Sequence, residues 1–170
     1  MPDKSTIDKA KKDEQEGKSA STQAGEFVHD EIEKIRKGKH GAKSAKQAIA
    51  IGLSEARRAG VKLKQPKKGT VSEKTRANAK RESEKGQNHE PISPTRSRAR
   101  IKALKKEPTS TVSKSALSRQ AKSAAKKRSG ASRSASAKKA ARTRASEGRP
   151  AAKKGAGRRT SRRRSVSAKK

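Results

Sequence analysis

Large apolar residues are concentrated in the first 65 positions of the chain, where they recur at helical spacing. Within residues 22–37, five apolar residues fall in one arc of about 140° if each residue turns the helix by 100°. These residues are Ala24, Phe27, Val28, Ile32 and Ile35. Glu31 lies inside the same arc and weakens the stripe. The pattern predicts an amphipathic helix from Thr22 to Lys37 that ends at Gly38.

A second helix is predicted between residues 44 and 60 by signals at both of its ends. Ser44-Ala45-Lys46-Gln47 fits a capping box, in which Ser44 caps the helix and Gln47 reaches back. Gly60 stands where a left-handed residue would close the helix, and Val61 follows at the position that packs back on Ala56. The segment therefore has a defined start and a defined stop.

The apolar face of this second helix consists largely of small residues. It contains Ala45, Ala48, Ile49, Gly52, Leu53 and Ala56. The four-residue spacing of Ala48, Gly52 and Ala56 predicts that a neighbouring helix approaches closely. Ile51 points almost the opposite way, so we expect it to be exposed. Such a residue is either an isolated surface apolar residue or part of a self-association or partner surface.

The remaining segments give weaker signals. Ser5-Thr6-Ile7-Asp8 is a start signal for a marginal helix from Ser5 to Glu16, which Gly17 ends. Residues 69–95 are polar and punctuated by proline and glycine, which predicts a flexible linker with one transient helix near Glu73–Glu84. Segments 96–106 and 113–128 have helix-tolerant spacing, and we expect them to become helical only when phosphates neutralise their charge.

The expected fold class is therefore a small all-α N-terminal unit followed by a mostly disordered, basic, low-complexity tail. The N-terminal unit would comprise residues 1–68 with two to three short helices. Residues 69–95 would form the linker and residues 96–170 the tail. So thin an apolar core predicts marginal stability, with a homodimer through the helical unit as one way to gain more.

Composition excludes several classes of protein. The chain of 170 residues has a formal net charge of +33, is 26% hydrophobic and contains one aromatic residue, Phe27. A large enzyme core is excluded on this basis. The absence of cysteine rules out disulfides and zinc–thiolate sites. No apolar run approaches the roughly 20 residues that span a bilayer, and no secretory signal is evident, so we expect a cytoplasmic protein.

Catalytic and metal-binding patterns are also missing from the sequence. His29, His40 and His89 have no partner at ligand spacing, so no metal site is predicted. The motifs of phosphate-binding loops, serine hydrolases and zinc proteases do not occur. The acidic residues near position 31 are expected to pair with Lys34, Arg36 and Lys37. We predict neither enzymatic activity nor a cofactor.

Basic residues increase sharply along the chain. Residues 1–90 contain 22 basic and 14 acidic residues, whereas residues 91–170 contain 27 basic residues and only Glu107 and Glu147 as acids. Such an excess selects polyanions as partners, because spaced Lys and Arg side chains follow phosphates without a fixed shape. No aromatic residue is present in this part to stack on unpaired bases, which favours the backbone of duplex DNA.

The predicted nucleic-acid-binding residues form two groups. The first lies after the second predicted helix and contains Arg57, Arg58, Lys62, Lys64, Lys67 and Lys68. The second consists of basic pairs and triplets in the tail: Lys126, Lys127, Arg128, Lys138, Lys139, Lys153, Lys154, Arg158, Arg159, Arg162, Arg163 and Arg164.

Two resemblances to known families accompany these patterns. Residues 17–28 (GKSASTQAGEFV) and 46–61 (KQAIAIGLSEARRAGV) resemble a family of small uncharacterised bacterial proteins. Members of that family are sometimes labelled plasmid-stabilisation or DNA-binding proteins. The resemblance covers about residues 5–65, implies a bacterial cytoplasmic origin and transfers no functional residues. The Ala-Lys-Lys units of the tail are similar to linker-histone C-terminal domains and to bacterial histone-like proteins.

The sequence thus favours a sequence-nonspecific, nucleoid-associated DNA-binding protein that neutralises and bridges phosphate backbones. RNA or ribosome binding by the same charges is one alternative. The other is a plasmid-stabilisation or antitoxin-like interaction module, in which Ile51 and the Ala/Gly face would contact a partner protein.

Overall fold

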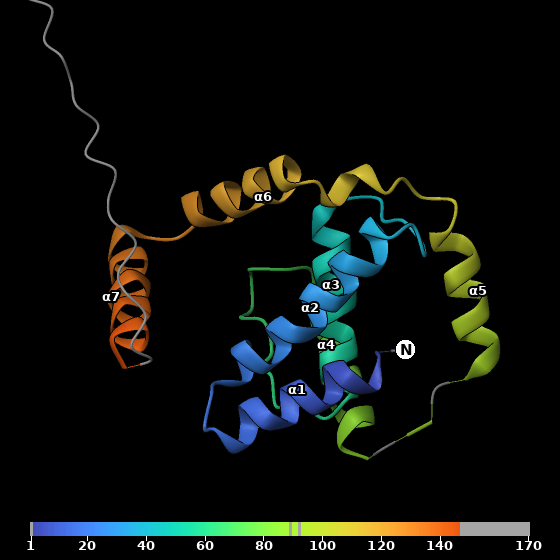
Figure 1. Ribbon diagram of the computed structural model, residues 1–170, viewed down its shortest axis with the longest axis horizontal. Helices are drawn as coiled ribbons and strands as arrows, with labels where there is room; N and C mark the ends of the chain where they lie inside the picture. Colours follow the sequence, from blue (N-terminus) through green and yellow to red (C-terminus); the bar gives the residue numbers. More distant parts are fainter. Residues whose placement is uncertain (1, 89, 92, 147–170) are drawn as a thin grey trace, which may run out of the picture. The chain divides into compact units, whose positions relative to one another are not determined.

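The structure, a computed structural model, describes residues 2–88, 90–91 and 93–146. Seven α-helices and one short 3-10 helix, η1, occur in these residues (Figure 1). Their bounds are α1 Lys4–Gln15, α2 Ala20–Arg36, α3 Ala45–Arg58, α4 Glu73–Gln87, α5 Pro94–Leu104, η1 Ser110–Val112, α6 Lys114–Lys126 and α7 Gly130–Ser146.

A first apolar cluster joins α1, α2 and the end of α3. Its buried members are Ala10, Ala24, Phe27, Ala56 and Val61. Phe27 has no exposed surface, and the predicted stripe of α2 is thereby confirmed as a buried face. Ile7 of α1 and Leu53 of α3 pack against the cluster and are half-buried. Burial of this face stabilises the α1–α3 unit because it removes apolar area from water.

A second cluster connects α2 and α3 to a segment far along the chain. Ile35, Ala42, Ala48 and Val112 are each 0% exposed and form its centre. Val112 belongs to η1, which contacts both α2 and α3. The core thus includes a residue that the sequence analysis assigned to a disordered tail.

The close approach of α2 and α3 depends on Gly52. A Cβ atom at Gly52 would lie 2.7 Å from the Val28 Cα and 3.0 Å from the Phe27 backbone oxygen. Any side chain there would push the two helices apart. The small-residue face predicted for α3 is confirmed at this position.

The predicted ends of α3 are also confirmed. The Ser44 hydroxyl accepts a hydrogen bond from the Gln47 amide at 3.2 Å, and the Gln47 side chain accepts one from the Lys43 amide at 2.6 Å. At the other end, Gly60 has a φ of 95° and the Val61 amide donates to the Ala56 carbonyl at 3.0 Å. This is the predicted Schellman ending. Glycine is favoured at position 60 because it adopts the left-handed backbone without strain.

The predicted fold class is wrong for the second half of the described chain. In place of a linker and a disordered tail, α4, α5, α6 and α7 occupy much of residues 73–146. Ser72 and Ser93 cap α4 and α5 by accepting bonds from Thr75 and Arg96 amides. Alanine, lysine and arginine favour helices locally. The expectation that these segments become helical only when phosphates neutralise their charge gave too little weight to these local preferences.

Two smaller predictions also need correction. Ile51 is not an exposed residue: it is 7% exposed, because α3 contacts α4 and η1 in addition to α2. Its side chain is therefore no surface for a partner. The first helix starts at Lys4 after the N-cap Asp3, one residue earlier than the predicted Ser5.

The described residues fall into two compact units that divide between Ala124 and Ala125. In the first unit, α1–α3 pack together and α4 contacts α3. The described part of α7 belongs to the second unit, and its side chains from 130 to 145 are all exposed. A helix that is polar on every side has no core of its own to stabilise it.

Candidate nucleic-acid interface

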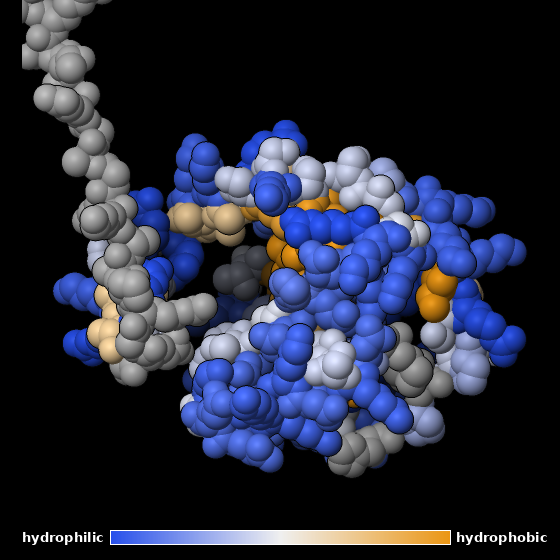
Figure 2. All heavy atoms as spheres, in the orientation of Figure 1, coloured by the Kyte–Doolittle hydropathy of each residue, from blue (hydrophilic) through white to orange (hydrophobic). Residues whose placement is uncertain are grey.

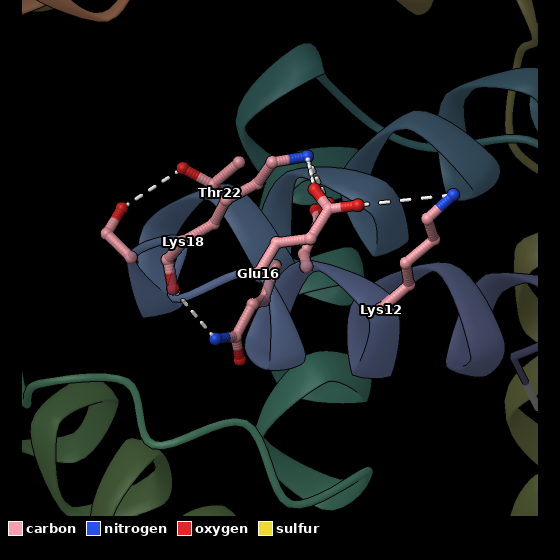
Figure 3. A network of polar contacts seen from close by, with 7 residues as sticks. Lys12, Glu16, Lys18 and Thr22 are labelled. Carbon is pink, nitrogen blue, oxygen red and sulfur yellow. Dashed lines mark hydrogen bonds and ion pairs between the residues drawn. The ribbon is translucent and has the colours of Figure 1, made fainter. Parts of the chain in front are cut away.

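Two lysines near the N-terminus, Lys12 and Lys18, have acidic partners within the same region. At the junction of α1 and α2, the Lys18 ammonium lies 2.9 Å from an Asp13 oxygen and 2.7 Å from a Glu16 oxygen. Lys12 lies 4.0 Å from Glu16 in the same network (Figure 3). The hydrogen bonds to Asp13 and then to Glu16 raise the pKa of Lys18 well above its ordinary value. These lysines are engaged within the fold.

The acidic residues of α2 form the pairs that the sequence predicted with Lys34 and Arg36. The Lys34 ammonium lies 2.7 Å from Asp30, and the Arg36 guanidinium lies 3.0 Å from Glu33. Burial has the largest single influence and by itself lowers the pKa of Lys34, but the hydrogen bond to Asp30 and the attraction of nearby acids, Glu55 first among them, together outweigh it, so the net shift is upward. Lys34 is buried beside its partner, and Arg36 is held at the helix surface by Glu33.

Arg57 and Arg58, which we predicted to contact nucleic acid, lie where α3 meets α4. The Arg58 Nε is 2.8 Å from a Glu82 oxygen of α4. The Arg57 guanidinium donates to the Leu53 carbonyl at 3.4 Å, and burial lowers its pKa against the attraction of Glu82. Close packing continues at Gly86, where a Cβ atom would lie 1.9 Å from the Arg57 carbonyl oxygen. Both arginines therefore help to join α4 to α3.

The other predicted residues of the first group have free access to solvent. Lys62, Lys64, Lys67 and Lys68 follow α3 in the connection to α4, and all four side chains are exposed. No ion pair with another described residue involves them. Their positions extend the exposed basic surface along this connection.

Basic residues of α5, α6 and α7 differ from those of the N-terminal helices because acidic partners are missing. Seventeen basic residues and one acidic residue, Glu107, lie between positions 91 and 146. Within this stretch, no described residue forms an ion pair with another described residue. All of the basic side chains here are exposed. Their charge is available to an external anion.

Five of the predicted tail residues lie in this exposed set: Lys126, Lys127, Arg128, Lys138 and Lys139. The Arg128 guanidinium also donates to the hydroxyls of Ser132 and Ser136. The remaining predicted residues, Lys153, Lys154, Arg158, Arg159, Arg162, Arg163 and Arg164, lie outside the described residues.

The sequence analysis missed the isolated basic residues between the pairs, which the helices present in the same way. They include Arg96, Arg98, Arg100 and Lys102 of α5, Lys114, Arg119 and Lys122 of α6, and Arg133, Arg142 and Arg144 of α7. The signal that identifies them is the depletion of acids after residue 90. That signal is present in the sequence, whereas a pattern of adjacent basic pairs does not include these residues.

On α6 three of the four basic residues share one face. Arg119, Lys122 and Lys126 fall within an arc of about 60° and span about 10 Å of the helix axis. Half-buried residues occupy another face of the same helix, namely Ala116, Leu117 and Gln120. A helix with this division presents a row of cations to one side. Duplex DNA, with one charge for each ~1.7 Å of axis, offers phosphates throughout that length.

Other kinds of chemistry have little support in the described residues. Phe27 is the single aromatic residue and is fully buried, so no aromatic ring is available to stack on a base. No group of three or more potential metal ligands occurs in the part of the chain that is described.

The face in Figure 2 is covered mainly by hydrophilic side chains. An open hollow of about 350 Å³ beside α4 is lined by Gln65, Glu73, Arg76, Ala77 and Lys80.

None of the helices described is both long and apolar enough to cross a membrane.

Among known families, residues 15–69 match a family of unknown function (DUF6496). The match extends from the end of α1 through α2 and α3, and it excludes the basic helices α5–α7. Comparison with curated proteins and with solved structures gives no significant match. The resemblance to plasmid-stabilisation and DNA-binding proteins thus stays a prediction, and a part of this chain is similar to a family without an assigned function.

Proposed function

We propose that the protein is a non-enzymatic, sequence-nonspecific DNA-binding protein of the nucleoid, which neutralises and bridges phosphate backbones. The observation that supports the proposal most strongly is the set of seventeen basic residues between positions 91 and 146 with Glu107 as the one acid. Unpaired exposed cations bind phosphates with release of counterions, and this term supplies most of the affinity in nonspecific binding.

Duplex DNA is the favoured polyanion, and its binding is expected to be independent of sequence. Single-strand binding relies on aromatic stacking, and the one aromatic ring is buried in the core. Contacts from spaced cations to phosphates have no means of distinguishing base sequences. Because α7 and the first unit are separate, basic residues of both are able to contact different duplexes, which is the basis for proposing bridging.

The proposal is tested by measuring how salt weakens binding of the full chain to two unrelated duplexes. We expect equal affinities for both and a linear fall of log K with log salt. Changing Arg119, Lys122 and Lys126 to Gln is expected to make the slope shallower by up to about 3, because each lost phosphate contact removes about 0.9. The helical content of the variant, measured by circular dichroism, shows whether α6 still forms.

A control variant removes the same charge from the N-terminal unit. Lys4, Lys9 and Lys11 of α1 are exposed, and their replacement by Gln is expected to change the slope by less than about 1. Equal changes in the two variants, or binding that does not depend on salt, would contradict the proposal. Structured RNA that displaces duplex DNA at equal nucleotide concentration would also overturn it, in favour of RNA binding.

A further inference from the structure

The loop between α2 and α3 is the docking point for the segment that joins α5 to α6. The Gly41 amide donates to the Leu104 carbonyl at 2.9 Å, and the Ala42 amide donates to the Pro108 carbonyl at 3.1 Å. The Thr111 hydroxyl donates to the Ala42 carbonyl at 2.9 Å. This segment therefore binds the loop mainly through backbone groups, over residues 104–111.

The docked segment and the loop also pack closely against each other. A Cβ atom at Gly41 would lie 1.8 Å from the Glu107 carbonyl oxygen, so only glycine allows the two backbones to approach in this way. Val112 fills the second apolar cluster at 0% exposure. The Arg36 guanidinium donates to the Val112 carbonyl at 3.4 Å. The docked position requires the loop at Gly41 to hold one conformation.

A buried acid and a histidine lie directly beside that loop. Glu31 of α2 is 1% exposed, and its Oε2 lies 3.6 Å from the Nε2 of His40. The His40 Nδ1 lies 3.1 Å from the Gly41 carbonyl oxygen. The side chain of His40 is 12% exposed. The imidazole thus stands between the buried carboxyl group and the backbone of the docking loop.

Hydrogen-bonding rules fix how many protons this arrangement needs. A carbonyl oxygen only accepts, so the His40 Nδ1 must bear a proton for the contact with Gly41. The other contact, 3.6 Å between Nε2 and the Glu31 Oε2, is too long for a hydrogen bond. A second proton on one of the two groups makes it favourable, because the proton either charges the imidazole beside the carboxylate or neutralises the carboxyl group. Without it, a lone pair faces a buried carboxylate whose Oε1 has no hydrogen-bond partner. An unpaired buried charge is strongly unfavourable.

We infer that Glu31 and His40 form a one-proton latch that holds the α2–α3 loop in the conformation on which residues 104–112 dock. Loss of the shared proton releases the docked segment and, with it, the attachment of basic helices α5 and α6 to the α2–α3 region. The latch regulates how these helices are held, and it is independent of which polyanion they bind.

The charged groups around Glu31 set the direction of the pH dependence. Burial raises the pKa of Glu31, and among its neighbours Glu55 of α3 raises it further, whereas His40, Lys34 and Arg100 oppose the shift. A carboxyl whose pKa is raised in the folded state stabilises it below the ordinary value of 4.5, and this contribution disappears as pH rises through the raised pKa. Taken together, however, an ordinary carboxyl and an ordinary imidazole in the undocked chain also hold one proton between them up to about pH 6.5, so docking should weaken as pH rises above about 6.5.

Hydrogen exchange at two amides tests the inference in the full chain. The Gly41 and Ala42 amides are protected by the docked segment itself. We expect their protection factors, corrected for the intrinsic exchange rate, to fall by up to about tenfold per pH unit above about pH 6.5. The Val61 amide at the end of α3 serves as an internal reference, and its protection should lack this dependence.

Two variants and a control complete the test. Glu31→Gln removes the acid at nearly constant size and should abolish the weakening at Gly41 and Ala42 as pH rises. His40→Gln leaves the buried acid without the imidazole that opposes its raised pKa, so the weakening should persist but begin nearer the ordinary carboxyl value of 4.5. His29→Gln is the matched control, because His29 is an exposed residue of the same helix as Glu31, and it should leave the dependence intact. Protection that is constant with pH in the unmodified chain would overturn the inference. So would an unchanged pH dependence in both His40→Gln and a folded Glu31→Gln.

Discussion

The helices α1–α4 and the helices α5–α7 differ mainly in where their acidic residues lie. Ion pairs connect Lys18 to Asp13, Lys34 to Asp30 and Arg58 to Glu82 in the first group. In the second group, Glu107 is the sole acid between positions 91 and 146. The two regions are both rich in lysine and arginine. The comparison teaches that basic residues identify a binding surface only after those with internal partners have been set aside.

Burial separates the same two regions. Phe27, Ile35 and Val112 have no exposed surface, whereas the described side chains of α7 are exposed on every side. The first region, with Leu104 and Val112 docked on it, is held by apolar contacts, whereas α7 relies on local helix preferences alone. We therefore expect core substitutions to affect stability and to have little effect on binding. Charge substitutions in α5–α7 should affect binding and have little effect on stability.

The largest expected effect on stability comes from Phe27→Ala. Removal of a fully buried aromatic side chain should lower the free energy of unfolding by about 3–5 kcal/mol, which is enough to unfold so small a core. Chemical denaturation followed by circular dichroism measures the change. Duplex binding at low salt should persist in this variant. Loss of binding in parallel with unfolding would show that the two regions depend on each other.

Gly52→Ala should have an intermediate effect, because its new methyl group would meet the Val28 backbone at 2.7 Å. Overpacking of this kind lowers stability by about 1–3 kcal/mol. Gly25→Ala provides the matched control on α2, where nothing lies within 4 Å of the new Cβ. The control should gain about 0.5–1 kcal/mol from helix preference. A Gly52→Ala protein as stable as the Gly25→Ala protein would contradict the close packing of α2 and α3.

The smallest of these effects concerns the ion pair between Arg58 and Glu82. Its side chains are 21% and 29% exposed, and a double-mutant cycle with Arg58→Gln and Glu82→Gln should give a coupling of about 1 kcal/mol. The exposed pair Lys80–Glu84 should give less than about 0.5 kcal/mol in the same cycle. A zero coupling for Arg58–Glu82 would return Arg58 to the candidate binding surface.

The sequence predicted the parts of the fold that depend on local signals. Ser44 and Gly60 mark the ends of α3 because a cap and a left-handed turn each require particular residue types. The stripe around Phe27 was readable because a single helix face produces a regular period. These signals do not depend on what the helix later contacts.

Local sequence signals did not predict the contacts between segments that are far apart in the chain. Ile51 is buried because α3 has neighbours other than α2, and the period of one helix does not reveal a second neighbour. The docking of Val112 and the pairing of Arg58 with Glu82 join residues whose proximity no local pattern encodes. The buried Glu31 was noted as a break in the stripe, but its partner His40 lies beyond the end of α2.

Composition placed the proposed binding surface in the second half of the chain. The disorder that it predicted for the described part of that half was wrong. The excess of basic over acidic residues after position 90 was sufficient to favour a polyanion. Disorder did not follow from it, because Ser72, Ser93 and the many alanines favour helices without needing a core.

The contrast between the two regions is tested most directly by an NMR titration of the full chain with a short duplex DNA. Backbone amide shifts report each helix separately, so the region that contacts DNA is identified without any substitution. We predict that shifts concentrate in α5, α6 and α7, and that amides of the α2–α3 core, such as those of Phe27 and Ala48, stay unchanged. Shifts centred on α1–α3, with α5–α7 unaffected, would contradict the account.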